Sequence, residues 1–179
     1  SGDVILVDFN QFEAGAWPTS PMDAAGAVRN KDVLSYPFSG NFGNTQGSLY
    51  FETNVTEIPT NSVARMWLSD IGANRQILNY RTNARVDTFD GTNNGQWVDS
   101  LTAGVTSKLA TSWSGTAITY VRDGSVIAPT VDTFDGNWDI ANNIGIGTDS
   151  NVAQLCGMMK NVRFYSRALT SAELQALTG

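Results

Sequence analysis

The 179-residue chain contains no histidine and only one cysteine, Cys156. A Ser-His-Asp triad, a Cys-His pair and a zinc site built from histidine or several cysteines each need residues that this chain lacks. A single cysteine also excludes a disulfide within the chain. Because Cys156 lies between Leu155 and Gly157 at the start of an apolar segment, we expect a small buried residue there rather than a reactive thiol.

Positive charge is scarce as well, since the chain has only three lysines and a formal net charge of -6. Nucleic-acid binding and attraction to anionic membrane surfaces both draw on clustered lysine and arginine. No apolar run approaches the roughly 18 residues that a membrane-spanning helix needs. The sequence therefore predicts neither a nucleic-acid partner nor insertion into a membrane.

The residues that are present favour one globular domain over residues 1–179, with 41% hydrophobic and 16% charged residues. Short apolar or alternating segments recur between turn-forming residues, which is typical of antiparallel β structure. Asp123-Gly124 separates two of them and predicts a type I′ hairpin. The expected strands include residues 4–7, 48–53, 63–68, 76–80 and 117–121.

The last residues of the chain predict one short helix, over residues 171–177. Thr170 and Glu173 have the spacing of a capping box, in which each side chain accepts a hydrogen bond from an otherwise unpaired backbone N–H group. Leu169 and Leu174 occupy the two positions of a hydrophobic staple. With the strands before it, this pattern predicts an all-β fold: a two-sheet antiparallel jelly-roll sandwich with one short C-terminal helix.

Residues 157–174 resemble the closing strand and short helix of the laminin-G-like branch of the concanavalin A-like lectin/glucanase superfamily. Three further segments, at 108–115, 119–126 and 143–147, resemble strands of that family in the same order. The specific resemblance covers about residues 105 to 179, whereas residues 1–104 match only in pattern. It implies the sandwich fold already predicted and allows for a bound calcium ion.

The ending is also similar to the C-terminal modules of bacteriophage structural proteins and of secreted bacterial carbohydrate-binding proteins. That similarity implies a non-catalytic carbohydrate-binding or adhesion module on a virion surface or otherwise outside the cell. A glycan or cell-surface polysaccharide would be the partner. The alternative is a structural or decoration domain that associates with virion proteins or with itself and has no sugar site. Because no histidine is present, we expect glycan binding to change little between about pH 5.5 and 8.

Enzymes share this sandwich, and the glycosidases among them carry two or more carboxylates as Glu-x-Asp-x-Glu on one strand. Retaining hydrolysis needs two such groups roughly 5 Å apart. The chain has no such string and only four glutamates: Glu13, Glu52, Glu57 and Glu173. A lyase of this class would usually use a histidine or tyrosine base beside arginine and glutamine, and histidine is missing. We therefore expect no catalysis.

Candidate sugar-binding residues come from loops and from one strand. Trp97, Trp138 and Trp17 flank loops, where an indole ring can either stack on a sugar or anchor the loop. Trp67 and Trp113 lie in alternating strand segments and are expected in the core. Polar side chains that could face a ligand or solvent occur on nearby strands and turns: Arg75, Asn79, Tyr80, Arg81, Asp87 and Asp90.

A hexapeptide, Val-Asp-Thr-Phe-Asp-Gly, occurs at residues 86–91 and again at 131–136. Two copies are too few for a solenoid. One explanation is two strand ends with the same alternation, in which valine and phenylalanine face inward and Asp-Gly makes the turn. The other is that both copies contribute acidic and aromatic side chains to one ligand-binding rim.

Calcium is the cofactor to consider, because clustered aspartate and asparagine supply the oxygen ligands that it prefers. One candidate set is Asp135, Asn137 and Asp139, and another is Asp87, Asp90 and Asn93. Neither follows the spacing of an EF-hand loop. The alternative is that these residues are turn formers, since aspartate and asparagine before glycine are common in turns.

Overall fold

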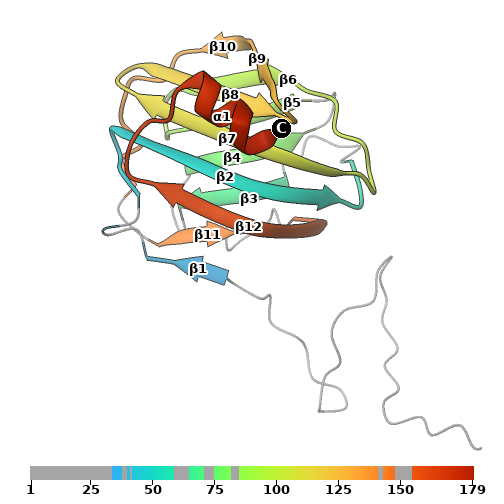
Figure 1. Ribbon diagram of the computed structural model, residues 1–179. Helices are drawn as coiled ribbons and strands as arrows, with labels where there is room; N and C mark the ends of the chain where they lie inside the picture. Colours follow the sequence, from blue (N-terminus) through green and yellow to red (C-terminus); the bar gives the residue numbers. More distant parts are fainter. Residues whose placement is uncertain are drawn as a thin grey trace, which may run out of the picture. The chain divides into compact units, whose positions relative to one another are not determined.

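A computed structural model of the chain describes residues 34–37, 40, 42–58, 65–70, 75–81, 85–140, 143–147 and 155–179. These residues form two antiparallel sheets packed face to face, with one short helix at the C-terminus (Figure 1). The predicted two-sheet sandwich is therefore confirmed. The strand expected at residues 4–7, Glu13 and Trp17 lie outside the described residues, so one domain over the whole chain stays a prediction.

The larger sheet has seven strands in the order β1-β11-β3-β4-β5-β6-β10, and the smaller has five in the order β12-β2-β7-β8-β9. The seven strands are β1 (Leu34–Tyr36), β11 (Ile144–Ile146), β3 (Arg65–Asp70), β4 (Arg75–Arg81), β5 (Arg85–Phe89), β6 (Asn94–Val98) and β10 (Pro129–Asp132). The five strands are β12 (Gly157–Tyr165), β2 (Gln46–Val55), β7 (Thr106–Ser114), β8 (Ala117–Arg122) and β9 (Ser125–Ile127).

The space between the sheets is filled largely by aromatic rings. Trp67 and Trp113 are buried there, as their alternating strand contexts predict. Ring pairs bridge the two sheets: Trp97 lies 5.3 Å from Tyr120, and Phe51 lies 5.5 Å from Trp67. Each such pair contributes about 0.5–1.5 kcal/mol beyond the burial of apolar area.

The helix α1 (Ser171–Thr178) begins as the capping box predicts. The Thr170 hydroxyl accepts a hydrogen bond from the Glu173 backbone N–H, and the Glu173 carboxylate accepts one from the Thr170 N–H at 2.8 Å. Hydrogen bonds to the Glu173 carboxylate from the Arg167 guanidinium, the Thr170 N–H and the Thr170 hydroxyl lower the pKa of Glu173 to about 2. No helix in the described ranges is long and apolar enough to cross a membrane.

The apolar side of α1 covers the outer face of the five-stranded sheet (Figure 1). Leu169 and Leu174, the two staple residues, are buried there against Tyr50, Ala110 and Val121. This sheet therefore has apolar packing on both faces, between the sheets and beneath the helix.

The predicted β8–β9 hairpin is also present. Asp123 and Gly124 both have positive φ angles, of +47° and +77°, as a type I′ turn requires. The Gly124 N–H donates to the Thr178 hydroxyl at 3.0 Å, which ties the turn to the end of α1.

The two hexapeptide copies lie on either side of β6, because β5 and β10 both pair with it. Val86 is opposite Trp97 and points into the core, whereas Val131 is opposite Gln96 and is 37% exposed. This shift of one residue turns equivalent side chains to opposite faces of the sheet. The expectation that valine faces inward in both copies is therefore wrong, although Gly91 and Gly136 both make turns at positive φ.

Cys156 is only partly buried, which corrects the expectation of a fully buried residue. It precedes β12 at the edge of the five-stranded sheet, where its carbonyl accepts a hydrogen bond from the Thr56 N–H at 2.9 Å. The next residue must be glycine, since a Cβ on Gly157 would lie 2.2 Å from the Asn54 carbonyl oxygen.

Candidate ligand-binding face

The outer face of the seven-stranded sheet carries a row of polar side chains across β4, β5 and β6. Tyr80, Val86 and Trp97 are buried in the core between the sheets. Because successive strand residues point to opposite faces, their neighbours Asn79, Asp87 and Gln96 point outward. The register places Asn79 opposite Asp87, and Asp87 opposite Gln96. Among the described elements, the one helix covers the other sheet and leaves this face without one.

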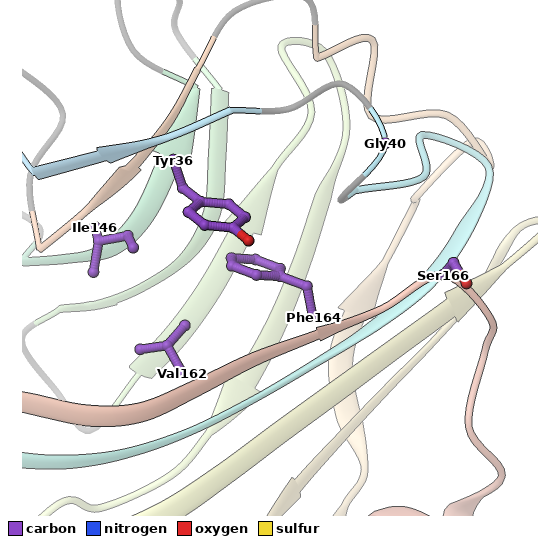
Figure 2. Close-up of a pocket in the computed structure, with 6 residues that line it drawn as sticks. All are labelled: Tyr36, Gly40, Ile146, Val162, Phe164 and Ser166. Carbon is purple, nitrogen blue, oxygen red and sulfur yellow. The ribbon is translucent and has the colours of Figure 1, made fainter.

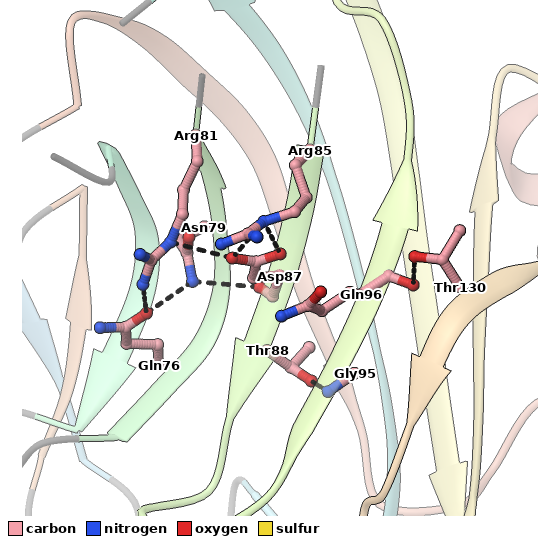
Figure 3. A network of polar contacts seen from close by, with 9 residues as sticks. All are labelled: Gln76, Asn79, Arg81, Arg85, Asp87, Thr88, Gly95, Gln96 and Thr130. Carbon is pink, nitrogen blue, oxygen red and sulfur yellow. Dashed lines mark hydrogen bonds and ion pairs between the residues drawn. The ribbon is translucent and has the colours of Figure 1, made fainter. Parts of the chain in front are cut away.

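Two arginines meet the carboxylate of Asp87 at the centre of this row (Figure 3). The Arg81 Nε lies 2.9 Å from Asp87 Oδ2, and the Arg85 Nε lies 2.8 Å from Oδ1. The geometry follows from the strands, since Arg81 and Arg85 are paired across β4 and β5 and Arg85 is two residues before Asp87. The Asp87 side chain is 4% exposed, against 30% for Arg81 and 37% for Arg85. The carboxylate is therefore covered, and the guanidiniums face solvent.

The electrostatics of this group leave an excess of positive charge. Burial raises the pKa of Asp87, but Arg85 and Arg81 both oppose the shift and favour the ionised form. With Asp87 ionised between its two arginines, the group carries two positive charges and one negative charge. Arg81 Nη2 donates to Gln76 Oε1 at 3.3 Å. Within the described ranges, no hydrogen-bond partner accepts from Arg81 Nη1 or from the two terminal nitrogens of Arg85.

Asn79 connects the Gln76 side chain to the backbone of Asp87. Its side-chain nitrogen donates to Gln76 Oε1 at 2.8 Å and to the Asp87 carbonyl at 3.1 Å. Its Oδ1 is buried and has no partner among the described residues. On β6, the Gly95 N–H donates to Thr88 Oγ1 and the Gln96 carbonyl accepts from the Thr130 hydroxyl, which fixes the backbone beside the row (Figure 3).

A small pocket of about 200 Å³ adjoins the two arginines, where β4 ends and β5 begins. Its lining residues combine apolar, polar and charged side chains: Ile58, Tyr80, Arg81, Arg85, Asp99, Ser100 and Leu101. Asp99 accepts a hydrogen bond from the Tyr120 hydroxyl at 2.6 Å and pairs with Arg122. Burial raises the pKa of Asp99, while Tyr120 and Arg122 oppose the shift. Asp99 is thus a fixed part of the pocket wall.

The two tryptophans predicted as sugar platforms are core residues instead. Trp97 and Trp138 are both 0% exposed, so neither offers a ring face to a ligand. Trp97 packs against Tyr120, and Trp138 packs between Phe134 at 4.9 Å and Trp113 at 5.9 Å. Loop-flanking positions in the sequence did not show that both rings fold inward between the sheets.

Tyr80 and Asp90 also differ from the predicted roles. The Tyr80 ring packs 4.9 Å from Trp67 and its hydroxyl donates to the Glu57 carbonyl, so it forms a pocket wall but no exposed stacking surface. The Asp90 carboxylate accepts hydrogen bonds from the Thr92 and Asn93 N–H groups at 2.8 and 2.7 Å. It is therefore a turn former. Of the predicted ligand-binding residues, Asn79, Arg81 and Asp87 are brought together.

The predicted calcium set forms a hydrogen-bonded turn. Asp135 Oδ1 accepts from the Asn137 N–H at 3.0 Å, Asn137 Oδ1 accepts from the Asp139 N–H, and the Asn137 side-chain nitrogen donates to Asp139 Oδ1. One side-chain oxygen of each residue is thus used within the turn, and this arrangement does not fit a ready-made metal site. No group of three or more acidic, cysteine or histidine side chains suited to a metal occurs in the described part of the chain. Calcium binding stays a prediction.

A second pocket, of about 370 Å³, lies at the other side of the sandwich, lined by residues of β1, β11 and β12 (Figure 2). Tyr36 and Phe164 stack in it with ring centroids 5.5 Å apart, beside Ile146 and Val162. Its described lining includes no charged side chain. Among its described lining residues there is no counterpart to the fixed charged groups, Arg81, Arg85 and Asp99, of the smaller pocket.

Gln76, Arg85, Gln96 and Asp99 are site residues that the sequence did not single out. The spacing of Arg85 and Asp87 could have indicated a shared sheet face, since residues two apart on a strand point the same way. Gln76 is harder to predict, because the β4–β5 register is irregular between Gln76 and Asn79. Asp99 lies beyond the end of β6, where alternation gives no guide.

Comparison with known proteins supports the fold. No protein-family model and no curated protein matches the chain. Among solved structures, the CBM40 module of the Ruminococcus gnavus IT-sialidase, bound to α2,3-sialyllactose, matches 85% of this chain and 96% of its own, with a TM-score of 0.61 and 14% identity. The chain has a concanavalin A-like sandwich fold.

Two further structures show how widely this fold occurs. A heptameric SAP-like pentraxin from Limulus polyphemus matches 76% of this chain and 70% of its own, with a TM-score of 0.56 and 11% identity. The Trypanosoma rangeli sialidase matches 81% of this chain but only 25% of its own, with a TM-score of 0.63 and 14% identity. At such identities the similarity shows the fold alone, so function must be argued from the site.

Proposed function

We propose that this chain is a non-catalytic carbohydrate-binding or adhesion module that binds a glycan on the outer face of its seven-stranded sheet. The observation that carries the proposal is the pair of partly exposed arginines, Arg81 and Arg85, which the buried Asp87 holds in place on this face beside Gln96. Sugar hydroxyls need paired donors and acceptors, and the partly exposed guanidiniums of Arg81 and Arg85 with the partly exposed amide of Gln96 can supply both on a rigid sheet. A structure with the same fold was determined with a bound sialyllactose, which supports the proposal.

The absence of catalysis is part of this proposal. Two of the three described glutamates are engaged elsewhere: Glu52 pairs with Lys160 at 3.2 Å, and Glu173 is held in the helix cap. Asp87 and Asp99, the buried carboxylates near the pocket, are each tied to arginine. The CBM40 structure, which is matched over 96% of its own length, is a carbohydrate-binding module. The sialidase structure is matched over only 25% of its own length.

The place where the module is displayed is proposed from the sequence resemblance. The resemblance of residues 157–174 to modules of phage structural proteins favours display on a virion surface, or otherwise outside the cell, with a cell-surface polysaccharide as partner. A decoration domain that associates with virion proteins or itself is the competing function, and it requires no sugar site.

A glycan array with the full chain separates these functions. We expect binding to at least one class of glycan, reproduced in solution by calorimetry, and no release of reducing or unsaturated sugar ends from bound polysaccharides. Sugar release would contradict the non-catalytic role. Silence across the array, together with tight binding to a purified virion protein, would contradict carbohydrate recognition and support assembly.

A further inference from the structure

We infer that Arg81 and Arg85 bind the carboxylate of an acidic sugar, and that the adjoining pocket takes the ring of that same sugar unit. The inference deepens the proposed function and rests on it. It concerns the class of glycan and the part of the glycan that is held.

The group formed by Arg81, Arg85 and Asp87 has an excess of positive charge. Two guanidiniums share one carboxylate, Asp87, so one positive charge remains unbalanced. Within the described ranges, the other charged residue that lines the adjoining pocket, Asp99, is already paired with Arg122. A ligand carboxylate would supply the missing negative charge, and charge-assisted hydrogen bonds are roughly twice as strong as neutral ones.

Both guanidiniums are held in place by the Asp87 carboxylate. Both Nε atoms are fixed within 3 Å of the Asp87 carboxylate. Arg85 keeps both terminal nitrogens without a partner in the described ranges, and its side chain is 37% exposed. A planar guanidinium whose position is already fixed binds a planar carboxylate through two parallel hydrogen bonds and loses little side-chain freedom. Asp87 therefore acts as a positioning residue for a carboxylate-binding fork.

The net charge of the chain limits the kind of anion. At a net charge of -6, the protein repels densely charged polyanions, while a local positive group still attracts a ligand with one charge. This favours a glycan with a single carboxylate at the bound unit over a highly sulfated chain.

The pocket beside the two arginines is small. Its volume of about 200 Å³ is below the roughly 300–1,000 Å³ of pockets that enclose drug-sized ligands. It accommodates one sugar ring against Ile58 and Leu101, with Ser100 beside it. The structure thus assigns recognition to one acidic unit rather than to an extended run of sugars.

The test uses the full chain with paired glycans that differ only in the acidic group: sialyllactose against lactose, glucuronic acid-terminated against glucose-terminated disaccharides, and a sulfated lactose. Calorimetry at low and high salt measures each affinity. We expect at least tenfold tighter binding of one carboxylated glycan than of its neutral partner, and weaker binding at high salt. Arg85→Gln should lower that affinity at least tenfold, and Arg85→Lys by less, because it keeps the charge but loses the fork.

The matched control is Arg163→Gln, which removes the same charge from the other sheet, where Arg163 lies over the Tyr50 ring. It should leave the affinity unchanged within twofold. Thermal unfolding of each variant establishes that it is folded. Equal binding of acidic and neutral partners, preference for the sulfated sugar, or full affinity in folded Arg85→Gln would overturn this inference and leave the proposed function standing. If wild type binds no glycan at all, the proposed function fails and this inference with it.

Discussion

Replacing Trp97 with alanine separates a core role from a ligand role for this ring. Its side chain is 0% exposed and its ring lies 5.3 Å from Tyr120, so removal leaves a cavity between the sheets. A buried tryptophan replaced by alanine costs about 3–5 kcal/mol of unfolding free energy. At about 2–4 °C per kcal/mol for a chain of this size, the melting temperature should fall by roughly 6–20 °C.

The assay is thermal or denaturant unfolding followed by circular dichroism, with glycan affinity measured below the transition. Val98→Ala is the matched control, because Val98 is the next residue on β6 and is 61% exposed. It should change stability by no more than about 0.5 kcal/mol. An unchanged melting temperature in Trp97→Ala, combined with lost glycan binding, would refute the core assignment and restore the sugar-stacking role.

Three further predictions follow from local geometry. Gly157→Ala should destabilise the chain by more than about 1 kcal/mol in denaturant unfolding. The reason is that φ at Gly157 is +153° and the new Cβ would meet the Asn54 carbonyl oxygen. A variant as stable as wild type would contradict this. The pKa of Glu173 is lowered to about 2, so the stability that its carboxylate gives the folded chain is complete above about pH 4.5 and is lost as the pH falls towards 2. Glu173→Gln should flatten that part of the plot of unfolding free energy against pH. An unaltered plot would count against the cap. If the turn at Asp135 binds calcium, CaCl₂ should raise the melting temperature and Asp135→Asn should abolish the rise; no rise in wild type would end the calcium prediction.

Much of the fold could be predicted because its strongest patterns are local. The capping box at Thr170, the staple at Leu169 and Leu174, and the Asp123-Gly124 turn each depend on a few adjacent residues, and all three are present. Alternation likewise placed Trp67 in the core.

The prediction failed where the outcome depends on register between distant strands. Two identical hexapeptides place Val86 inside and Val131 outside, because β6 pairs with them one residue out of step. The burial of Trp138 depends on packing with Trp113, which lies on β7. No single segment of sequence carries that information.

The candidate site was predicted in part for the same reason. Asn79 and Arg81 share a strand face and could be grouped by spacing alone. Their meeting with Asp87 and Arg85 depends on the pairing of β4 with β5, which the structure supplies. The pocket beside them forms only where the ends of several strands and loops converge.

Chemical-shift mapping of the full chain by NMR, with the carboxylated glycan that binds it most tightly, shows directly whether the sugar lies beside Arg81 and Arg85. A glycan bound beside the two arginines should cause the largest changes at amides of β4 and β5 around Arg81, Arg85 and Asp87, and at Ser100 and Leu101. Changes confined to the Tyr36 and Phe164 pocket, or to the turn at Asp135, would contradict it.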